Sequence, residues 1–305
     1  MFFYHKNAEQ NSSFYYGGNY PGESQEPFYH SGLTDYALRV SVATNIGKVR
    51  GNHEDNFYLE RLYIDDVYRN DFSATYTIPE PDGMSFAVFD GMGGAAYGEV
   101  ASDIAVKTLR EYEKKLRHAD GTRMIDQLVG AYTTEANDAI CDMLTQKHCK
   151  IGGTTFSMLY FMGDAVKLYY LGDSRIYSYK ENSLSQLTRD HTVANQKVDA
   201  SIYTEEEAKK SPDQHRLTLY IGADRKKVGL NADSRPPIPL EMGDKFLLCT
   251  DGLTNMCSDD EIAELLSQNY YNEAAVLVQA ALRNGGIDNV TCIALEVLPS
   301  SSETD

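Results

Sequence analysis

The sequence predicts an α+β fold in which antiparallel β-sheets are flanked by helices. Three observations lead to this prediction. Strand-like runs come in clusters, a pair of long helical segments separates the clusters, and neighbouring strands are joined by hairpin-sized links such as Met162-Gly163-Asp164. A doubly wound parallel sheet would instead alternate strands with crossover helices. The clustered order therefore favours antiparallel pairing.

Short apolar runs near both ends and in the centre of the chain have the composition of strands. Several of them alternate with a period of two, which is typical of a sheet with one buried face. The expected strands are residues 38–43, 86–89, 154–160, 166–171, 175–179, 245–250 and 290–297.

Helical periodicity marks two long segments in the first half of the chain. Val100, Ile104 and Tyr112 lie on one face of the first, and apolar residues recur every three or four positions from Ile125 to Leu144 in the second. Three shorter helices are expected further on. Two begin with the capping-box patterns Thr204-Glu205-Glu206-Glu207 and Ser258-Asp259-Asp260-Glu261, and one spans 272–283 before Gly285-Gly286.

The 305 residues, 42% of them hydrophobic, are enough for one substantial core. No internal repeat and no linker divides residues 34–298, which we expect to form a single domain. Residues 1–33 are polar and rich in tyrosine, and are expected to be an N-terminal extension, flexible or packed on the domain. Residues 299–305 are expected to form a polar C-terminal tail.

Charge excludes several classes of partner. The chain has 28 basic and 45 acidic residues, a net charge of -17, which argues against nucleic acid and anionic membranes. No run approaches the ~20 apolar residues that span a bilayer, and no signal peptide is evident, so we expect a cytoplasmic protein. The five cysteines are widely spaced and odd in number, which predicts reduced thiols and neither disulfides nor zinc.

Acidic residues recur where predicted strands begin or end. Asp90 and Asp251 each follow an apolar run and precede a glycine, Asp173 lies in Gly172-Asp173-Ser174-Arg175, and Asp288 precedes Asn289. Any single Asp-Gly pair is as readily a turn former. Four together would repel one another unless a cation compensates, and all-oxygen ligands favour Mg²⁺ or Mn²⁺.

A pair of such ions suggests hydrolysis of a phosphoester. Two metals ~3.5 to 4 Å apart that share a carboxylate activate a water and polarise a phosphoryl oxygen. Such a site also needs a cation for the substrate phosphate, and Arg50 is the candidate because its planar guanidinium can hold two phosphate oxygens. The alternative is an ordinary surface arginine.

Seven short motifs follow one another along the chain. They are Arg50 with Asn52-His53-Glu54-Asp55-Asn56-Phe57, Asp90-Gly91-Met92-Gly93-Gly94, Gly152-Gly153-Thr154-Thr155, Gly172-Asp173-Ser174-Arg175, Leu187-Thr188-Arg189-Asp190-His191-Thr192, Cys249-Thr250-Asp251-Gly252-Leu253 and Asp288-Asn289-Val290-Thr291. In this order they resemble the bacterial type-2C metal-dependent Ser/Thr protein phosphatases of the PPM family. The resemblance spans roughly residues 36–297 and implies a sandwich of two antiparallel sheets flanked by helices, in α/β/β/α layers with the metals at one end.

The resemblance also implies ligands for two Mn²⁺ or Mg²⁺ ions. Asp90 would bridge both ions, and Gly91 would offer its backbone carbonyl to the second. Asp251 and Asp288 would complete the first site, and Glu54 would hold the second ion directly or through water.

Further positions carry implied roles. Asp55 would be a direct ligand or a support behind the ligands, Asp173 would contribute to a third metal site shared with Asp251, and Arg50 would bind the substrate phosphate. Met92 stands where some members have a histidine, and it cannot donate a proton, so the general acid is left unassigned. Residues 193–221 correspond to the family's mobile flap beside the active site.

The resulting hypothesis is a Mg²⁺/Mn²⁺-dependent phosphatase that hydrolyses phosphoserine and phosphothreonine through a water bridging two ions. Its partners would be phosphorylated proteins, with a Ser/Thr kinase or its targets expected. The alternatives are a catalytically silent binding or regulatory module, and an enzyme for small phosphoesters or phosphotyrosine. His53 and His191 lie inside motifs, and both are expected to be hydrogen-bonded scaffold residues.

Overall fold

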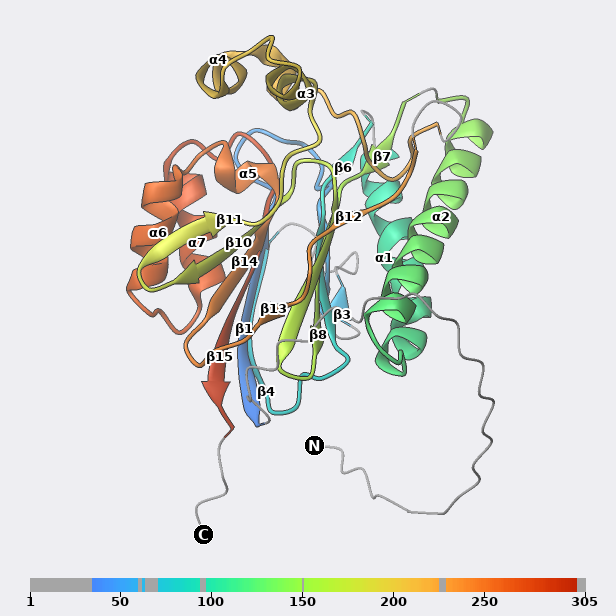
Figure 1. Ribbon diagram of the computed structural model, residues 1–305. Helices are drawn as coiled ribbons and strands as arrows, with labels where there is room; N and C mark the ends of the chain where they lie inside the picture. The colour runs from blue at the N-terminus through green and yellow to red at the C-terminus, as the bar shows by residue number, and fades with distance from the viewer. Residues whose placement is uncertain are drawn as a thin grey trace, which may run out of the picture.

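A computed structural model describes residues 35–59, 62–63, 71–93, 97–149, 151–224 and 229–300. Two antiparallel sheets face each other in the middle of the molecule, and helices cover both outer faces (Figure 1). The predicted fold class and the α/β/β/α layering are thus confirmed. The expected extension at 1–33 and residues 301–305 of the expected tail lie outside the described residues.

The first and last described strands are neighbours in one six-stranded sheet, where they pair antiparallel with Tyr36 opposite Pro299. Pro299 therefore ends a strand rather than beginning the tail. In order across this sheet the strands are β11 (Ser183–Gln186), β10 (Arg175–Lys180), β14 (Lys245–Cys249), β15 (Val290–Pro299), β1 (Tyr36–Asn45) and β4 (Asp71–Ile78).

The second sheet is also antiparallel, and two short strands share one of its edges. Its order is β12 (Asp233–Ser234), β9 (Ala165–Leu171), β8 (Phe156–Met162), β5 (Ser85–Phe89), β2 (Asn56–Leu59) and β3 (Leu62–Tyr63), with β13 (Ile238–Pro239) also paired to β9. A separate small ribbon joins β6 (Gly91–Met92) to β7 (Gly153–Thr154).

Helices form the two outer layers and a projection at one end of the sandwich. The long pair α1 (Tyr97–Arg117) and α2 (Thr122–Gln146) covers the second sheet, and α6 (Asp259–Ser267) and α7 (Glu273–Arg283) cover the first (Figure 1). At the end where β6 and α5 (Asp251–Thr254) lie, α3 (Val193–Asp199), α4 (Glu205–Lys210) and the 3₁₀ turn Pro212–His215 form the flap. None of the described helices is long and apolar enough to cross a membrane.

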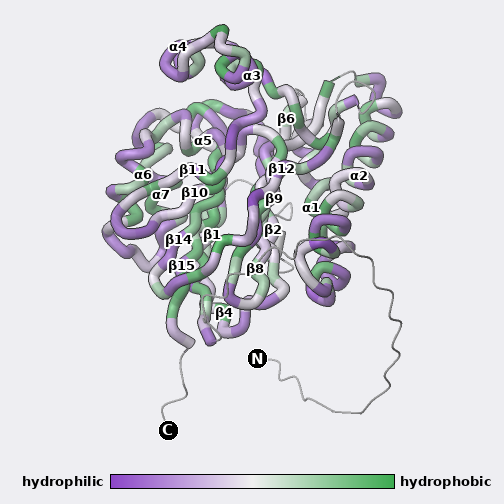
Figure 2. The backbone as a smooth tube through the Cα atoms, viewed as in Figure 1, coloured by the Kyte–Doolittle hydropathy of each residue, from purple (hydrophilic) through white to green (hydrophobic). Residues whose placement is uncertain are grey.

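Three clusters of buried side chains correspond to the three interfaces between layers. The first cluster lies between the sheets and includes Leu38, Phe86 and Leu295. The second packs α1 and α2 against the second sheet, and the third packs α5, α6 and α7 against the first sheet. The central strands are correspondingly apolar, and hydrophilic residues follow the outer helices and loops (Figure 2). The central strands of each sheet are buried on both faces, which gives the site a rigid support.

Two local expectations were wrong in detail. The strand expected at 154–160 is broken at Thr155, because the Thr155 N–H donates to the Asp90 carbonyl at 2.9 Å and leaves the sheet ladder there. The Thr204 capping box is complete, but at Ser258 only half of the box forms. The carboxylate of Glu261 accepts hydrogen bonds from Asn284 Nδ2, at 2.9 and 3.1 Å, and is not placed on the Ser258 backbone.

Candidate metal centre

A pocket of about 590 Å³ opens at the end of the sandwich that carries the flap. Five acidic residues line it, and each lies within two residues of a strand end: Glu54, Asp90, Asp173, Asp251 and Asp288. Gly91, Met92 and Arg50 line the same pocket. The structure therefore brings together the four aspartates that the sequence singled out, although they are spread over almost 200 positions.

Asp90 is held at the end of β5 by its backbone. Its N–H donates to Thr155 Oγ1 at 2.8 Å, and its carbonyl accepts from the Thr155 N–H at 2.9 Å. Thr155 Oγ1 is also hydrogen-bonded to Ser174 Oγ at 2.7 Å, which ties β5 to the turn that carries Asp173. Since the backbone is fixed in this way, the Asp90 carboxylate is free to face the pocket.

Asp173 follows a glycine that the turn requires. Gly172 has a φ of 105°, and a Cβ added there would lie 2.6 Å from Thr155 Cγ2. His191 holds this turn through two hydrogen bonds to Gly172. The ring Nδ1 of His191 accepts from the Gly172 N–H at 3.0 Å, and the backbone N–H of His191 donates to the Gly172 carbonyl at 2.8 Å. The ring also stacks on Tyr170. His191 is therefore the scaffold residue that the sequence predicted.

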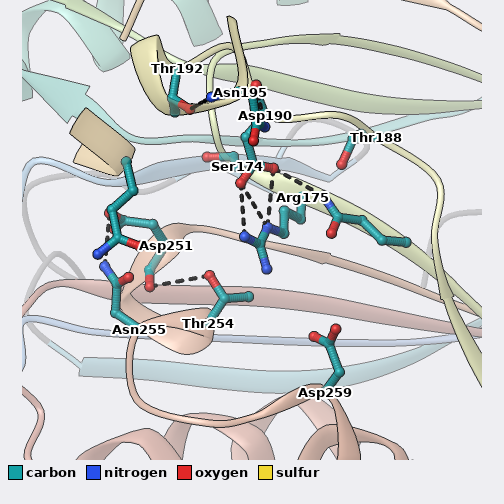
Figure 3. A network of polar contacts seen from close by, with 12 residues as sticks. Ser174, Arg175, Thr188, Asp190, Thr192, Asn195, Asp251, Thr254, Asn255 and Asp259 are labelled. Atoms are coloured by element: carbon teal, nitrogen blue, oxygen red, sulfur yellow. Dashed lines mark hydrogen bonds and ion pairs between the residues drawn. The ribbon is translucent and has the colours of Figure 1, made fainter. Parts of the chain in front are cut away.

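Asp251 begins α5, and Asn255 Nδ2 donates to its carboxylate at 2.9 Å (Figure 3). The next residue, Gly252, packs against the chain beside Asp288, since a Cβ there would lie 1.8 Å from the Asn289 carbonyl oxygen. This close approach sets Asp251 and Asp288 next to the same pocket. Arg50 Nη2 donates to Asp288 Oδ2 at 2.6 Å, and about half of the Arg50 side chain is exposed.

Glu54 is positioned by Asn289, a residue 235 positions away. Asn289 Oδ1 accepts from the Glu54 N–H at 2.7 Å, and Asn289 Nδ2 donates to the carbonyls of Ile46 and Asn52 at 2.9 and 3.0 Å. The Gly91 N–H donates to the Glu54 carbonyl at 3.2 Å. The buried side-chain amide of Asn289 therefore joins the segment that follows β1 to the segment that precedes β15, at the pocket wall.

Asp55 lies behind the pocket and does not line it. It is buried, and its Oδ2 accepts hydrogen bonds from Thr250 Oγ1 and Thr291 Oγ1, both at 2.8 Å. Of the two roles that the resemblance left open, this placement supports the one behind the ligands. His53 is also buried, with Nε2 2.9 Å from Thr44 Oγ1, and is a scaffold residue as expected.

The electrostatics of the carboxylates fit an oxygen-ligated cation. Burial first, and then the charges of Asp55, Asp251, Asp173 and Asp288, raise the pKa of Asp90 well above its ordinary value. Burial and neighbouring carboxylates likewise raise the pKa of Asp173 and of Asp251. A divalent cation would offset this repulsion and favour the charged forms.

The donor set also agrees with the chemistry of Mg²⁺ and Mn²⁺. Carboxylates and the Gly91 carbonyl are hard oxygen donors, and the pocket has room for water. Over the described ranges, no three His, Cys, Asp or Glu side chains already form a metal-binding group by themselves. We take the lining residues to fit ions that keep much of their coordination from water, as Mg²⁺ usually does.

We expect the stability of the protein in EDTA to fall as the pH rises from about 4 to about 8. Burial and the charges of Asp288 and Asp251 raise the pKa of Asp55 to about 8, against about 3.9 for an aspartate in an unfolded chain. Because the folded state holds its proton more tightly, deprotonation across this window favours unfolding. Mn²⁺ should flatten the dependence, as measured by thermal unfolding at four pH values. If the melting temperature changed equally with pH in Mn²⁺ and in EDTA, the prediction would be contradicted.

Three residues of the site were not assigned a role from sequence: Asn289, Asn255 and Thr155. Asn289 and Thr155 lie within recognised motifs, so their position near the site could have been predicted from the sequence. Their hydrogen-bond partners could not have been predicted in this way. His215 and Leu217 of the flap region also line the pocket. The flap therefore borders the acidic pocket, as its position in the motif order predicted.

Comparison with known proteins points to one family. The model of the Protein phosphatase 2C family matches residues 65–284, well over half of the chain. This match includes Asp90, Asp173 and Asp251, and its bounds do not reach Arg50, Glu54 or Asp288.

Two curated relatives illustrate the similarity. The serine/threonine protein phosphatase PstP of Mycobacterium tuberculosis is 30% identical over 263 residues, which is 86% of this chain and 45% of that protein. The chain thus spans about half the length of PstP. The protein phosphatase PhpP of Streptococcus pneumoniae is 29% identical over 259 residues, covering 83% of this chain and 95% of that one.

A solved structure shares the fold. The catalytic domain of PstP, determined in complex with two manganese ions, aligns with a TM-score of 0.67 at 29% identity, over 86% of this chain and 99% of that one. With the family match over residues 65–284, these similarities show that the chain belongs to the protein phosphatase 2C family.

Proposed function

We propose that the protein is a Mg²⁺/Mn²⁺-dependent phosphatase that hydrolyses phosphoserine and phosphothreonine in proteins. The observation that carries the proposal is that five carboxylates and Arg50 line one pocket. The names of PstP and PhpP as protein phosphatases, and the two manganese ions in the PstP catalytic domain, support it. Phosphorylated proteins are the proposed substrates, and a Ser/Thr kinase or its targets the proposed partners.

In this proposal the ions are held by Glu54, Asp90, Asp251 and Asp288, with the Gly91 carbonyl. Asp90 would be shared between two ions, and Asp173 would take part in a third site with Asp251. When bound, the ions would supply Lewis-acid polarisation of the phosphoryl group and a nucleophilic water at neutral pH. Asp55 would act through Thr250 and Thr291, which fix the ends of β14 and β15.

Arg50 would hold the phosphate of the substrate. Its side chain lines the pocket and is half exposed, so it can exchange the Asp288 carboxylate for phosphate oxygens without leaving the rim. A planar guanidinium can donate to two phosphate oxygens at once. The phosphoester is thereby oriented towards the carboxylates on the pocket floor.

Replacing Arg50 by alanine is expected to lower kcat/KM for a phosphothreonine peptide about 10- to 100-fold, mostly through KM. The physical reason is the loss of a charge-assisted hydrogen bond to phosphate, worth about 1.5 to 3 kcal/mol. Steady-state kinetics in Mn²⁺ measures the effect. Arg50→Lys should recover part of it, and Lys48→Ala, two positions away, should have wild-type kinetics. An unchanged KM in Arg50→Ala would remove Arg50 from the substrate site.

A panel of substrates distinguishes the proposed activity from its alternatives. Phosphate release from phosphothreonine, phosphoserine and phosphotyrosine peptides and from p-nitrophenyl phosphate should be compared in Mn²⁺, Mg²⁺ and EDTA. The proposal expects phosphothreonine and phosphoserine peptides to be preferred and all activity to be lost in EDTA. Absence of release in both metals would favour the silent module, and preference for p-nitrophenyl phosphate or phosphotyrosine would favour the other alternative.

A further inference from the structure

A second hollow, of about 360 Å³, lies beside the flap and shares no lining residue with the acidic pocket. We call it the basic groove. Its walls come from β10, the end of β11, the chain between β11 and α3, the start of α3, α4, the 3₁₀ turn and the chain after β12. Four cationic residues and two acidic ones line it: Arg175, Arg189, Lys209 and Arg235 with Asp190 and Glu205.

Two of the four cations are engaged by the protein itself. Arg175 donates from Nε and Nη2 to the Asp190 carboxylate, at 3.1 and 2.8 Å, as Figure 3 shows. Arg189 pairs with Asp199 on α3 at 2.6 Å and with Glu205 on α4 at 3.6 Å. These pairs satisfy both lining acids and hold the flap to the body of the domain.

The other two cations, Lys209 and Arg235, are exposed and make no ion pair with any described residue. After the internal pairs are matched, the groove therefore keeps an excess of two positive charges. In a chain whose net charge is -17, a hollow with unpaired cations favours an anionic ligand.

The groove and the acidic pocket are neighbours, because residues close together in the chain line both of them. Asp173 lines the pocket and Arg175, two residues later, lines the groove, so their Cα atoms are at most about 7 Å apart. The two hollows also adjoin at the flap, since Gln214 lines the groove and the next residue, His215, lines the pocket. A protein bound with one residue in the pocket therefore has other residues within reach of the groove.

From this arrangement we infer that the basic groove binds an anionic group of the substrate protein, a carboxylate or a second phosphate, close to the phosphoresidue being hydrolysed. The inference rests on the proposed phosphatase function. Lys209 and Arg235 are the residues that would contact the group, and Arg175 and Arg189 shape the groove through their own ion pairs. The groove would then select acidic or multiply phosphorylated segments.

The test compares three kinds of substrate. The first is a phosphothreonine peptide with neutral flanks, the second is a set of peptides that add a pair of glutamates three to eight residues to either side, and the third is p-nitrophenyl phosphate, which is too small to reach the groove. For the wild-type protein we expect a lower KM for at least one acidic peptide than for the neutral one. The double variant Lys209→Ala/Arg235→Ala should raise that KM about three- to tenfold, as expected for exposed ion pairs. Its kcat and its kinetics on p-nitrophenyl phosphate should stay unchanged.

Two further variants make the result specific. Lys210→Ala removes the neighbouring lysine, which is on α4 but does not line the groove, and it should behave as wild type. Arg235→Glu should reverse the preference, so that the neutral peptide has the lower KM. The wild-type preference should also weaken in 0.5 M NaCl, because exposed charges are screened.

The outcomes separate this inference from the proposed function. If the wild type hydrolyses all three substrates but shows no preference, or if the double variant keeps the preference, the groove does not bind substrate and the phosphatase proposal stands. An equal loss on p-nitrophenyl phosphate would show a general effect on the active site and would also overturn the inference. If no substrate is hydrolysed, both proposals fail.

Discussion

Replacing Asp90 by asparagine is expected to abolish Mn²⁺-dependent phosphate release from a phosphothreonine peptide, with a loss of about 10³-fold or more in kcat. Asparagine has nearly the shape of aspartate, and the two backbone hydrogen bonds with Thr155 do not involve the side chain. The variant therefore removes a charge and leaves the geometry. The measurement is initial phosphate release with a Mn²⁺ titration, because a weakened site would need more metal.

Stability provides the control for this variant. The pKa of Asp90 is raised by burial and by four neighbouring carboxylates, so a neutral side chain should relieve repulsion in EDTA. We expect a melting temperature equal to or above that of the wild type, together with an unchanged circular dichroism spectrum. Asp142→Asn, the same change at an exposed position of α2, should keep full activity. Full activity of Asp90→Asn, or wild-type activity in EDTA, would disprove the metal mechanism.

Replacing Gly252 by alanine is expected to destabilise the protein by about 3 kcal/mol, at the upper end of overpacking effects, and to weaken Mn²⁺ binding. The added Cβ would lie 1.8 Å from the Asn289 carbonyl oxygen, which is backbone and cannot turn aside as a side chain could. The two segments that carry Asp251 and Asp288 would have to separate. Urea unfolding in EDTA measures the first effect, and calorimetric titration with Mn²⁺ measures the second.

Gly130 provides the matched control for this substitution. It lies within α2, has no atom within 4 Å of an added Cβ, and has no left-handed φ. Gly130→Ala should therefore stabilise the protein by about 0.5 to 1 kcal/mol, because alanine loses less conformational freedom in a helix. If Gly252→Ala unfolded at the wild-type urea concentration, the close approach between the two chain segments would not be a constraint on the site.

Some strands of the structure were not predicted, because most of them lack the alternation of apolar and polar residues that marks a strand in a sequence. β11 is a short strand of residues Ser183–Gln186 with three polar positions, and only its pairing with β10 makes it a strand. β2 spans four residues that are buried on both faces, which gives no alternation. β4, by contrast, has Phe72, Ala74, Tyr76 and Ile78 on one face, a signal within reach of the sequence.

The candidate site divides in a similar way. The strand clusters, the long helix pair, the aspartates near strand ends and the order of motifs could all be predicted from the residues, because they depend on residue type and short spacing. Three features are visible only in the folded protein: Asp55 lies behind the pocket, Asn289 holds Glu54 from 235 positions away, and a basic groove adjoins the acidic pocket. Periodicity describes a residue's neighbours along the chain, whereas these features depend on contacts between segments that meet only when both sheets have formed.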